Sequence, residues 1–135
     1  MKRNKTECYC INLRRATTAL TKKYDSALEK TSLTINQFSI IKNISQFHNC
    51  DASMLADVMG IERTTLLRNI KPLVVKEIIM VSKKNNKKIF KLSKEGEILL
   101  DKAQNEWNKI QNEINDELGE KAKEFIELLN KIERI

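Results

Sequence analysis

Apolar residues recur every three or four positions over most of the chain, the spacing of one face of an α-helix. This spacing predicts helices over about 8–29, 34–47, 52–59, 62–74, 94–118 and 120–135. Residues 78–92 differ, with two short apolar runs on either side of a polar stretch at 83–88. Because asparagine tolerates positive φ, this segment is predicted to be a β-hairpin that turns at Asn85-Asn86.

Capping residues mark several helix boundaries. Thr34 and Gln37 have the spacing of a capping box, in which each side chain accepts a hydrogen bond from the other residue's backbone. Asp51 and Ser93 are further N-cap candidates, and Gly60 is placed to end the third helix. The predicted fold class is mainly α with a small β-hairpin wing, a winged helix-turn-helix with N- and C-terminal helices for dimerisation.

Charge is distributed unevenly over these elements. The 135 residues carry a net charge of +7. Residues 62–93 hold nine basic and two acidic residues, whereas residues 94–135 hold seven basic and eleven acidic ones. A basic segment next to an acidic one indicates a localised surface for a polyanion rather than general solubility.

The polar face of the helix at 63–74 suits the major groove of double-stranded DNA. Arginine can bind guanine through two hydrogen bonds, asparagine can bind adenine, and threonine can reach base edges or phosphates. Lysines crowded on the hairpin repel one another, a cost that phosphates would relieve. The candidate DNA contacts are Arg63, Thr64, Thr65, Arg68, Asn69 and Lys71 on the helix and Lys83, Lys84, Lys87 and Lys88 on the hairpin.

The polar helix face and the hairpin lysines are also compatible with a purely structural role. Any amphipathic helix has a polar face, and lysines also protect the edge of a sheet. A winged helix can equally be a protein-interaction module, for which a basic surface would favour acidic partners. DNA binding is distinguished from that alternative by its steep dependence on salt.

The terminal helices carry more apolar surface than a compact winged helix needs. We expect a homodimer to bury it, which would also place two DNA-contacting helices about one DNA turn apart. The alternative is a monomer whose long helices fold back on themselves. The candidate interface residues are Trp107, Ile110, Ile114, Phe125, Ile126, Leu129 and Ile132.

Several classes of function lack support in the sequence. There is no Gly-rich phosphate loop, no His-Glu metal motif and no usable nucleophile–base pair, so we expect neither an enzyme nor a cofactor. The apolar runs are too short for a membrane span. The polar start at residues 1–5 lacks a signal core, and three cysteines suit a reducing compartment, so we expect a cytoplasmic protein.

The cysteines leave two further alternatives. Cys8 and Cys10 lie near a helix N-terminus, where a thiolate is favoured, so a thiol-responsive regulator is one of them. A zinc site shared with His48 and Cys50 is the other, although its spacing is unusual for zinc. Buried or inert thiols are the simpler interpretation.

Four motifs in this order and spacing resemble the MarR family of transcriptional regulators over nearly the whole chain. They are 33–38 (LTINQF), 55–60 (LADVMG), 63–73 (RTTLLRNIKPL) and 92–96 (LSKEG), and the opening 8–16 (CYCINLRRA) is similar to one branch of that family. The resemblance implies a homodimer joined through the terminal helices and a helix around 63–73 in the major groove. It also implies a wing at the flanking minor groove and a small-molecule effector site between the two regions.

The resemblance divides the single domain at 1–135 into a DNA-binding region at about 31–93 and dimerisation regions at about 8–30 and 94–135. Two positions depart from the family pattern. The Asp-x-Arg of the family wing falls on Lys84-Asn85-Asn86, so the minor-groove arginine is missing. Glu77 stands where the family has glycine, which costs about 1 kcal/mol if the backbone is left-handed there.

Overall fold

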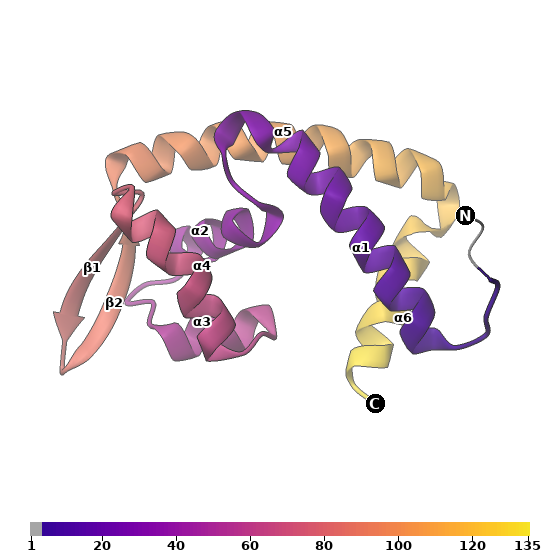
Figure 1. Cartoon of the computed structure of the whole chain (residues 1–135), viewed down its shortest axis with the longest axis horizontal. Helices are drawn as coiled ribbons and strands as arrows, with labels where there is room; N and C mark the ends of the chain where they lie inside the picture. The colour runs from indigo at the N-terminus through magenta and orange to yellow at the C-terminus, as the bar shows by residue number, and fades with distance from the viewer. Residues whose placement is uncertain (1–3) are drawn as a thin grey trace.

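The computed structural model describes residues 4–135, and these form a mostly helical protein with one antiparallel hairpin (Figure 1). The predicted mainly α fold with a small β-hairpin wing is confirmed. Residues 1–3, on which the expectation of no signal core partly rests, lie outside the described residues. The elements are α1 (Tyr9–Ala27), η1 (Glu29–Thr31), α2 (Ile35–Gln46), α3 (Ala52–Met59), α4 (Arg63–Val75), β1 (Ile79–Lys84), β2 (Lys87–Leu92), α5 (Lys94–Leu118), η2 (Gly119–Lys121) and α6 (Ala122–Glu133).

Helix α5 runs along one side of the molecule and spans two regions (Figure 1). Helices α2, α3 and α4 and the hairpin gather beneath its N-terminal half, and α1 and α6 lie beneath its C-terminal half. Helix α1 packs on α5, whereas the main contact of α6 is with η2, the short turn that leads into it. The winged-helix elements therefore form a unit of their own at one end.

The expected capping residues begin these helices. The Thr34 hydroxyl accepts from the Gln37 N–H at 3.1 Å, and the Gln37 side chain accepts from the Thr34 N–H at 3.1 Å. Asp51 accepts from the N–H of Met54 at 2.9 Å, and the Ser93 hydroxyl accepts from Gly96 at 3.0 Å. Because a cap fixes where a helix starts, these bonds set the position of each buried face.

The core lies where α2 meets α4 and α5. Ile40 and Ile41 of α2 are fully buried, as is Leu66 of α4. The ring of Trp107 stacks on Phe38 with centroids 6.1 Å apart, and Ile110 is only 6% exposed. Ile110 is therefore buried within the single chain and not at a surface that a second copy would cover, whereas Trp107 is half-buried and packs against the edge of the core.

The hairpin turns at Asn85-Asn86, as the sequence predicts. Both residues have positive φ, 52° and 63°, the geometry that a two-residue type I′ turn requires. Pairing continues to Lys84 and Lys87, so the strands are longer than the apolar runs that predicted them. The Phe90 N–H donates to the Cys50 carbonyl at 2.8 Å, which fastens the hairpin to the loop before α3.

The base of the hairpin is tightly tied to α5. Glu77 has a φ of 60°, so the backbone is left-handed at the position where the MarR-family pattern has glycine and this chain has glutamate. The Ser93 hydroxyl donates to the Glu77 carbonyl at 2.6 Å. Gly96 packs so closely on the Ile78 carbonyl that an added Cβ would lie 2.3 Å from its oxygen. This packing fixes the direction in which the hairpin leaves the core.

In the part of the chain that is described, no helix is long and apolar enough to cross a membrane.

Candidate nucleic-acid interface

Helices α3 and α4 form a helix-turn-helix in which α4 packs by one face only. Gly60 ends α3 with a φ of 64°, and the Ile61 N–H donates to the Ala56 carbonyl at 3.1 Å across the turn. Ala56 is small and buried where the two helices approach. Leu66 and Ile70 are buried on the inner face of α4, so its other face points away from the core.

That outer face carries most of the polar residues that the sequence selects. Arg63, Thr64, Arg68 and Lys71 are exposed. Thr65 and Asn69 are half-buried, and the Asn69 side-chain amide donates to the Thr65 carbonyl at 3.0 Å. Asn69 therefore has a partner within its own helix, which it would give up or share in binding a base.

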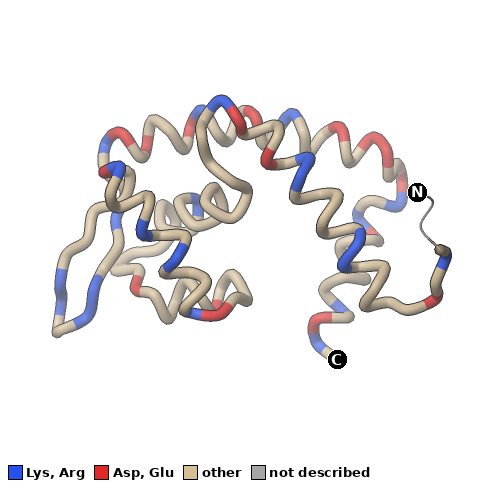
Figure 2. The backbone as a smooth tube through the Cα atoms, viewed as in Figure 1, with Lys and Arg blue, Asp and Glu red and all other residues tan. Residues whose placement is uncertain are grey.

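The four candidate lysines of the hairpin are all exposed and lie in two directly opposed pairs. Lys83 is paired with Lys88 and Lys84 with Lys87. Like charges placed opposite each other destabilise a hairpin, by about 0.2–1 kcal/mol for a pair. Figure 2 shows these charges at the tip of the hairpin, on the side of the molecule that also carries the basic residues of α4. This arrangement is suited to a polyanion that reaches both elements.

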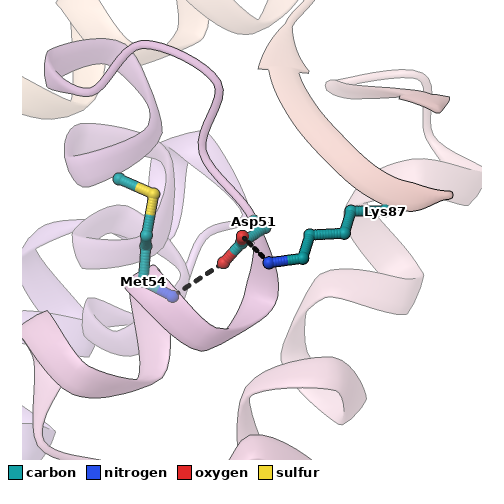
Figure 3. Close-up of polar contacts among 3 residues, drawn as sticks. All are labelled: Asp51, Met54 and Lys87. Carbon is teal, nitrogen blue, oxygen red and sulfur yellow. Dashed lines mark hydrogen bonds and ion pairs between the residues drawn. The ribbon is translucent and has the colours of Figure 1, made fainter. Parts of the chain in front are cut away.

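One carboxylate lies among these cations. Asp51 Oδ1 caps α3, and Asp51 Oδ2 is 4.0 Å from the Lys87 Nζ (Figure 3). Arg63 and Lys88 line the same hollow of about 460 Å³ between α3, α4 and the hairpin. The sequence indicated Asp51 only as a helix cap. No sequence signal pairs it with a lysine so far along the chain, since the turn and the Cys50–Phe90 bridge bring them together.

Sequence reasoning also missed exposed apolar residues near α4. Leu67 is 40% exposed and Val81 of β1 is 41% exposed, and both line a smaller hollow of about 230 Å³ between α4 and the hairpin. Leu67 lies about 60° from Ile70 around the helix, at the edge of the buried stripe. That position was the sequence signal from which its partial exposure could have been predicted. An apolar side chain here can contact a thymine methyl group.

The cysteines occupy two different environments. Cys8 and Cys10 are exposed at the start of α1. Cys50 is buried, and burial together with the Asp51 carboxylate raises the pKa of its thiol to about 11, which keeps it protonated. Among residues 4–135, no group of three or more His, Cys, Asp or Glu side chains could hold a metal ion, so the two halves of the zinc alternative do not come together.

The terminal helices present apolar side chains that nothing in the described chain covers. Neither α1 nor α6 has a buried residue. Of the candidate interface residues, Phe125, Ile126 and Ile132 are 38%, 52% and 41% exposed, while Ile114 and Leu129 are half-buried. Tyr9 and Leu128 extend the exposed apolar surface.

Comparison with known proteins agrees with this geometry. The family model that describes the MarR family matches residues 33–90. The crystal structure of the M. tuberculosis transcriptional regulator MosR is 32% identical, with a TM-score of 0.85 and 95% of each chain covered. MosR in complex with DNA is also 32% identical, with a TM-score of 0.80 and coverage of 95% of this chain and 98% of that one.

A more distant match shares the fold. The transcriptional repressor CouR bound to p-coumaroyl-CoA is 18% identical, with a TM-score of 0.86 over 95% of this chain and 93% of its own. A comparison with curated proteins gave no match. The helix-turn-helix, the basic hairpin and the 32% identity over almost the full length agree: the chain belongs to the MarR family, whose members are DNA-binding transcriptional regulators and not enzymes.

Proposed function

We propose that the chain is a homodimeric repressor that binds double-stranded DNA in a sequence-specific manner. The observation that carries the proposal is that cations of α4 and of the hairpin line the same hollows, Arg63 with Lys87 and Lys88 in one and Lys71 with Lys88 in the other. The MosR–DNA complex, from a protein 32% identical to this chain, supports DNA as the polyanion.

The two elements have different roles in this proposal. Helix α4 enters the major groove, where Arg68 and Arg63 can bind guanine and Thr64, Thr65, Asn69 and Lys71 can contact bases or phosphates. The hairpin lies on the flanking backbone or minor groove. Since its tip carries lysines and no arginine, Lys83, Lys84, Lys87 and Lys88 are assigned to phosphates rather than to bases.

The proposed dimer joins two chains through α1, α6 and the C-terminal part of α5. Phe125, Ile126 and Ile132 are exposed apolar residues of α6, and a second copy would bury them together with Ile114 and Leu129. The DNA-binding region is 31–93, and the dimerisation regions are 8–30 and 94–135. Two-fold symmetry then presents two copies of α4 to successive major grooves.

Repression follows from occupancy of the DNA alone. A dimer whose α4 helices and hairpins cover a promoter excludes other proteins from it, and this requires no surface beyond the DNA-binding one. We place this activity in the cytoplasm, with the DNA. A small-molecule effector would bind between the dimerisation and DNA-binding regions, where η1 and α5 line a hollow of about 270 Å³.

A mobility-shift assay with the DNA upstream of the protein's own gene tests the proposal. We expect a shift at low salt, with a log–log salt slope of about −0.9 per phosphate contact and stronger binding than to unrelated DNA. No shift at low salt would contradict the proposal and would favour the protein-interaction alternative.

A thiol-responsive regulator is the second candidate function. It is favoured by the exposure of Cys8 and Cys10 at the start of α1, in the proposed dimerisation region. Hydrogen peroxide would oxidise the thiol of Cys8 or Cys10 to a sulfenic acid and be reduced to one water molecule. Peroxide should then weaken DNA binding by the wild type and spare the Cys8→Ser/Cys10→Ser variant, and equal effects on both would exclude this candidate.

A further inference from the structure

A hollow of about 460 Å³ lies between the start of α3, the start of α4 and the hairpin. Three of the side chains that line it are cationic, Arg63, Lys87 and Lys88, and Asp51 is the one acidic residue in its lining. The lining therefore has an excess of positive charge. The hollow also lies between the two elements that are proposed to contact DNA.

Asp51 is held firmly in this hollow. Its Oδ1 accepts from the N–H of Met54 at 2.9 Å, so one oxygen is committed to the start of α3. The other oxygen faces the Lys87 ammonium at 4.0 Å (Figure 3). The Asp51 side chain is only 19% exposed, whereas that of Lys87 is 72% exposed. The anion of this pair is thus fixed, and the cation can move.

The ion pair is also weak enough for the Lys87 ammonium to leave Asp51 for another anion. A separation of 4.0 Å is at the outer limit of an ion pair, and exposed pairs of this kind contribute little stability. A DNA phosphate offers two unesterified oxygens and further negative charge from its neighbours along the strand, so it can compete for the ammonium. The cap on α3 would not need to change, because it uses the other oxygen of Asp51.

We infer that this hollow seats one DNA backbone phosphate, and that Asp51 holds the Lys87 ammonium in the free protein until the phosphate takes it. Arg63 and Lys88 complete the cationic lining of the seat. In the free protein, the pair adds to the backbone hydrogen bond between Phe90 and Cys50 that docks the hairpin on the loop before α3. On DNA, Lys87 leaves Asp51, and binding therefore includes the cost of breaking the pair. The inference rests on the proposed DNA-binding function and adds a determinant of its affinity.

A double-mutant cycle on DNA affinity tests the exchange. Full-length wild type, Asp51→Asn, Lys87→Gln and the double variant are titrated against a fluorescent duplex at several salt concentrations. Lys87→Gln should lower the magnitude of the salt slope by about 0.9, because one phosphate contact is lost.

The coupling between the two positions is the decisive quantity. Asp51→Asn removes a negative charge near the DNA both in the chain with Lys87 and in the Lys87→Gln chain. In the chain with Lys87, it also removes the ion pair that would otherwise have to break when DNA binds. The gain in affinity from Asp51→Asn should therefore be roughly two- to fivefold larger in the chain that keeps Lys87 than in the Lys87→Gln chain.

Two controls separate this coupling from other effects. Asparagine and serine are as good as aspartate at a helix N-cap, so Asp51→Asn and Asp51→Ser should both fold and give the same result. Lys84 lies directly opposite Lys87 in the hairpin and has no ion pair among residues 4–135. Lys84→Gln should weaken binding but leave the gain from Asp51→Asn unchanged.

The possible results distinguish a failure of the proposed DNA-binding function from a failure of this inference. If the wild type binds no DNA, both the proposed function and this inference are overturned. If the wild type binds DNA but Asp51→Asn gives equal gains with and without Lys87, or Lys87→Gln leaves the slope unchanged, only the inference is overturned. Inorganic phosphate, added at constant ionic strength, should leave the coupling intact. Loss of the coupling would show that the hollow takes free phosphate instead of the DNA backbone, which would also overturn the inference.

Discussion

Replacing Glu77 with glycine should stabilise the protein. Glu77 has a φ of 60°, and left-handed backbone costs a residue with a side chain roughly 1–2 kcal/mol. Glycine removes that cost but loses about 0.5–1 kcal/mol more conformational freedom on folding. The Glu77 side chain is exposed and forms no ion pair among residues 4–135, so little else is lost. The net gain should be about 0.5–1 kcal/mol in the free energy of unfolding.

Thermal unfolding at a fixed protein concentration measures this gain. For a chain of this length, the expected rise in Tm for Glu77→Gly is about 2–4 °C. Glu77→Ala is the matched control, because it removes the same charge but keeps a Cβ in left-handed backbone. Its Tm should stay close to that of the wild type. If Glu77→Gly is no more stable than Glu77→Ala, then backbone strain at residue 77 does not lower the stability of the wild-type protein.

Three further predictions concern the interface, the dimer and the buried thiol. Arg68→Ala should lose sequence preference, at a cost of about 1–3 kcal/mol on the preferred DNA, whereas Lys88→Ala should weaken binding to all sequences alike in the same titration. Phe125→Asp should give a monomer of 15.7 kDa by light scattering. Trp107→Ala should stay dimeric but lose about 1–3 kcal/mol of stability, because the half-buried ring stacks on Phe38, and a monomeric Trp107→Ala would contradict this packing within one chain. Cys50 should resist alkylation in the folded protein, because its thiol is buried. The pKa of this thiol is about 11 in the folded chain and lower in the unfolded one, so the free energy of unfolding should fall as the pH rises from about 9 to 11. The Cys50→Ala variant should show a smaller fall.

The local signals in the sequence predicted local structure well. Thr34, Asp51 and Ser93 begin their helices as expected, because a cap depends on residues only a few positions apart. The same holds for the turn at Asn85-Asn86, where both residues tolerate the positive φ that the turn needs.

Contacts between distant segments could not be predicted in this way. Periodicity shows that Trp107 faces something apolar, but it does not say whether Phe38 or a second chain covers it. The pairing of Asp51 with Lys87 depends on how the hairpin docks on the loop before α3, and this docking is a backbone contact without a sequence signature. At the candidate interface, the sequence therefore identified the exposed cations of α4 and the hairpin but not the carboxylate among them.

Selection of bound sequences from a random pool of duplex DNA tests the dimer and the DNA-contacting role of α4 together. We expect enrichment of an inverted repeat whose half-sites are about one helical turn apart, because two copies of α4 enter successive major grooves. The same selection with Arg68→Ala should lose preference at one position in each half-site. A pool that stays random, or an enriched site without two-fold symmetry, would contradict a homodimer that reads DNA through α4.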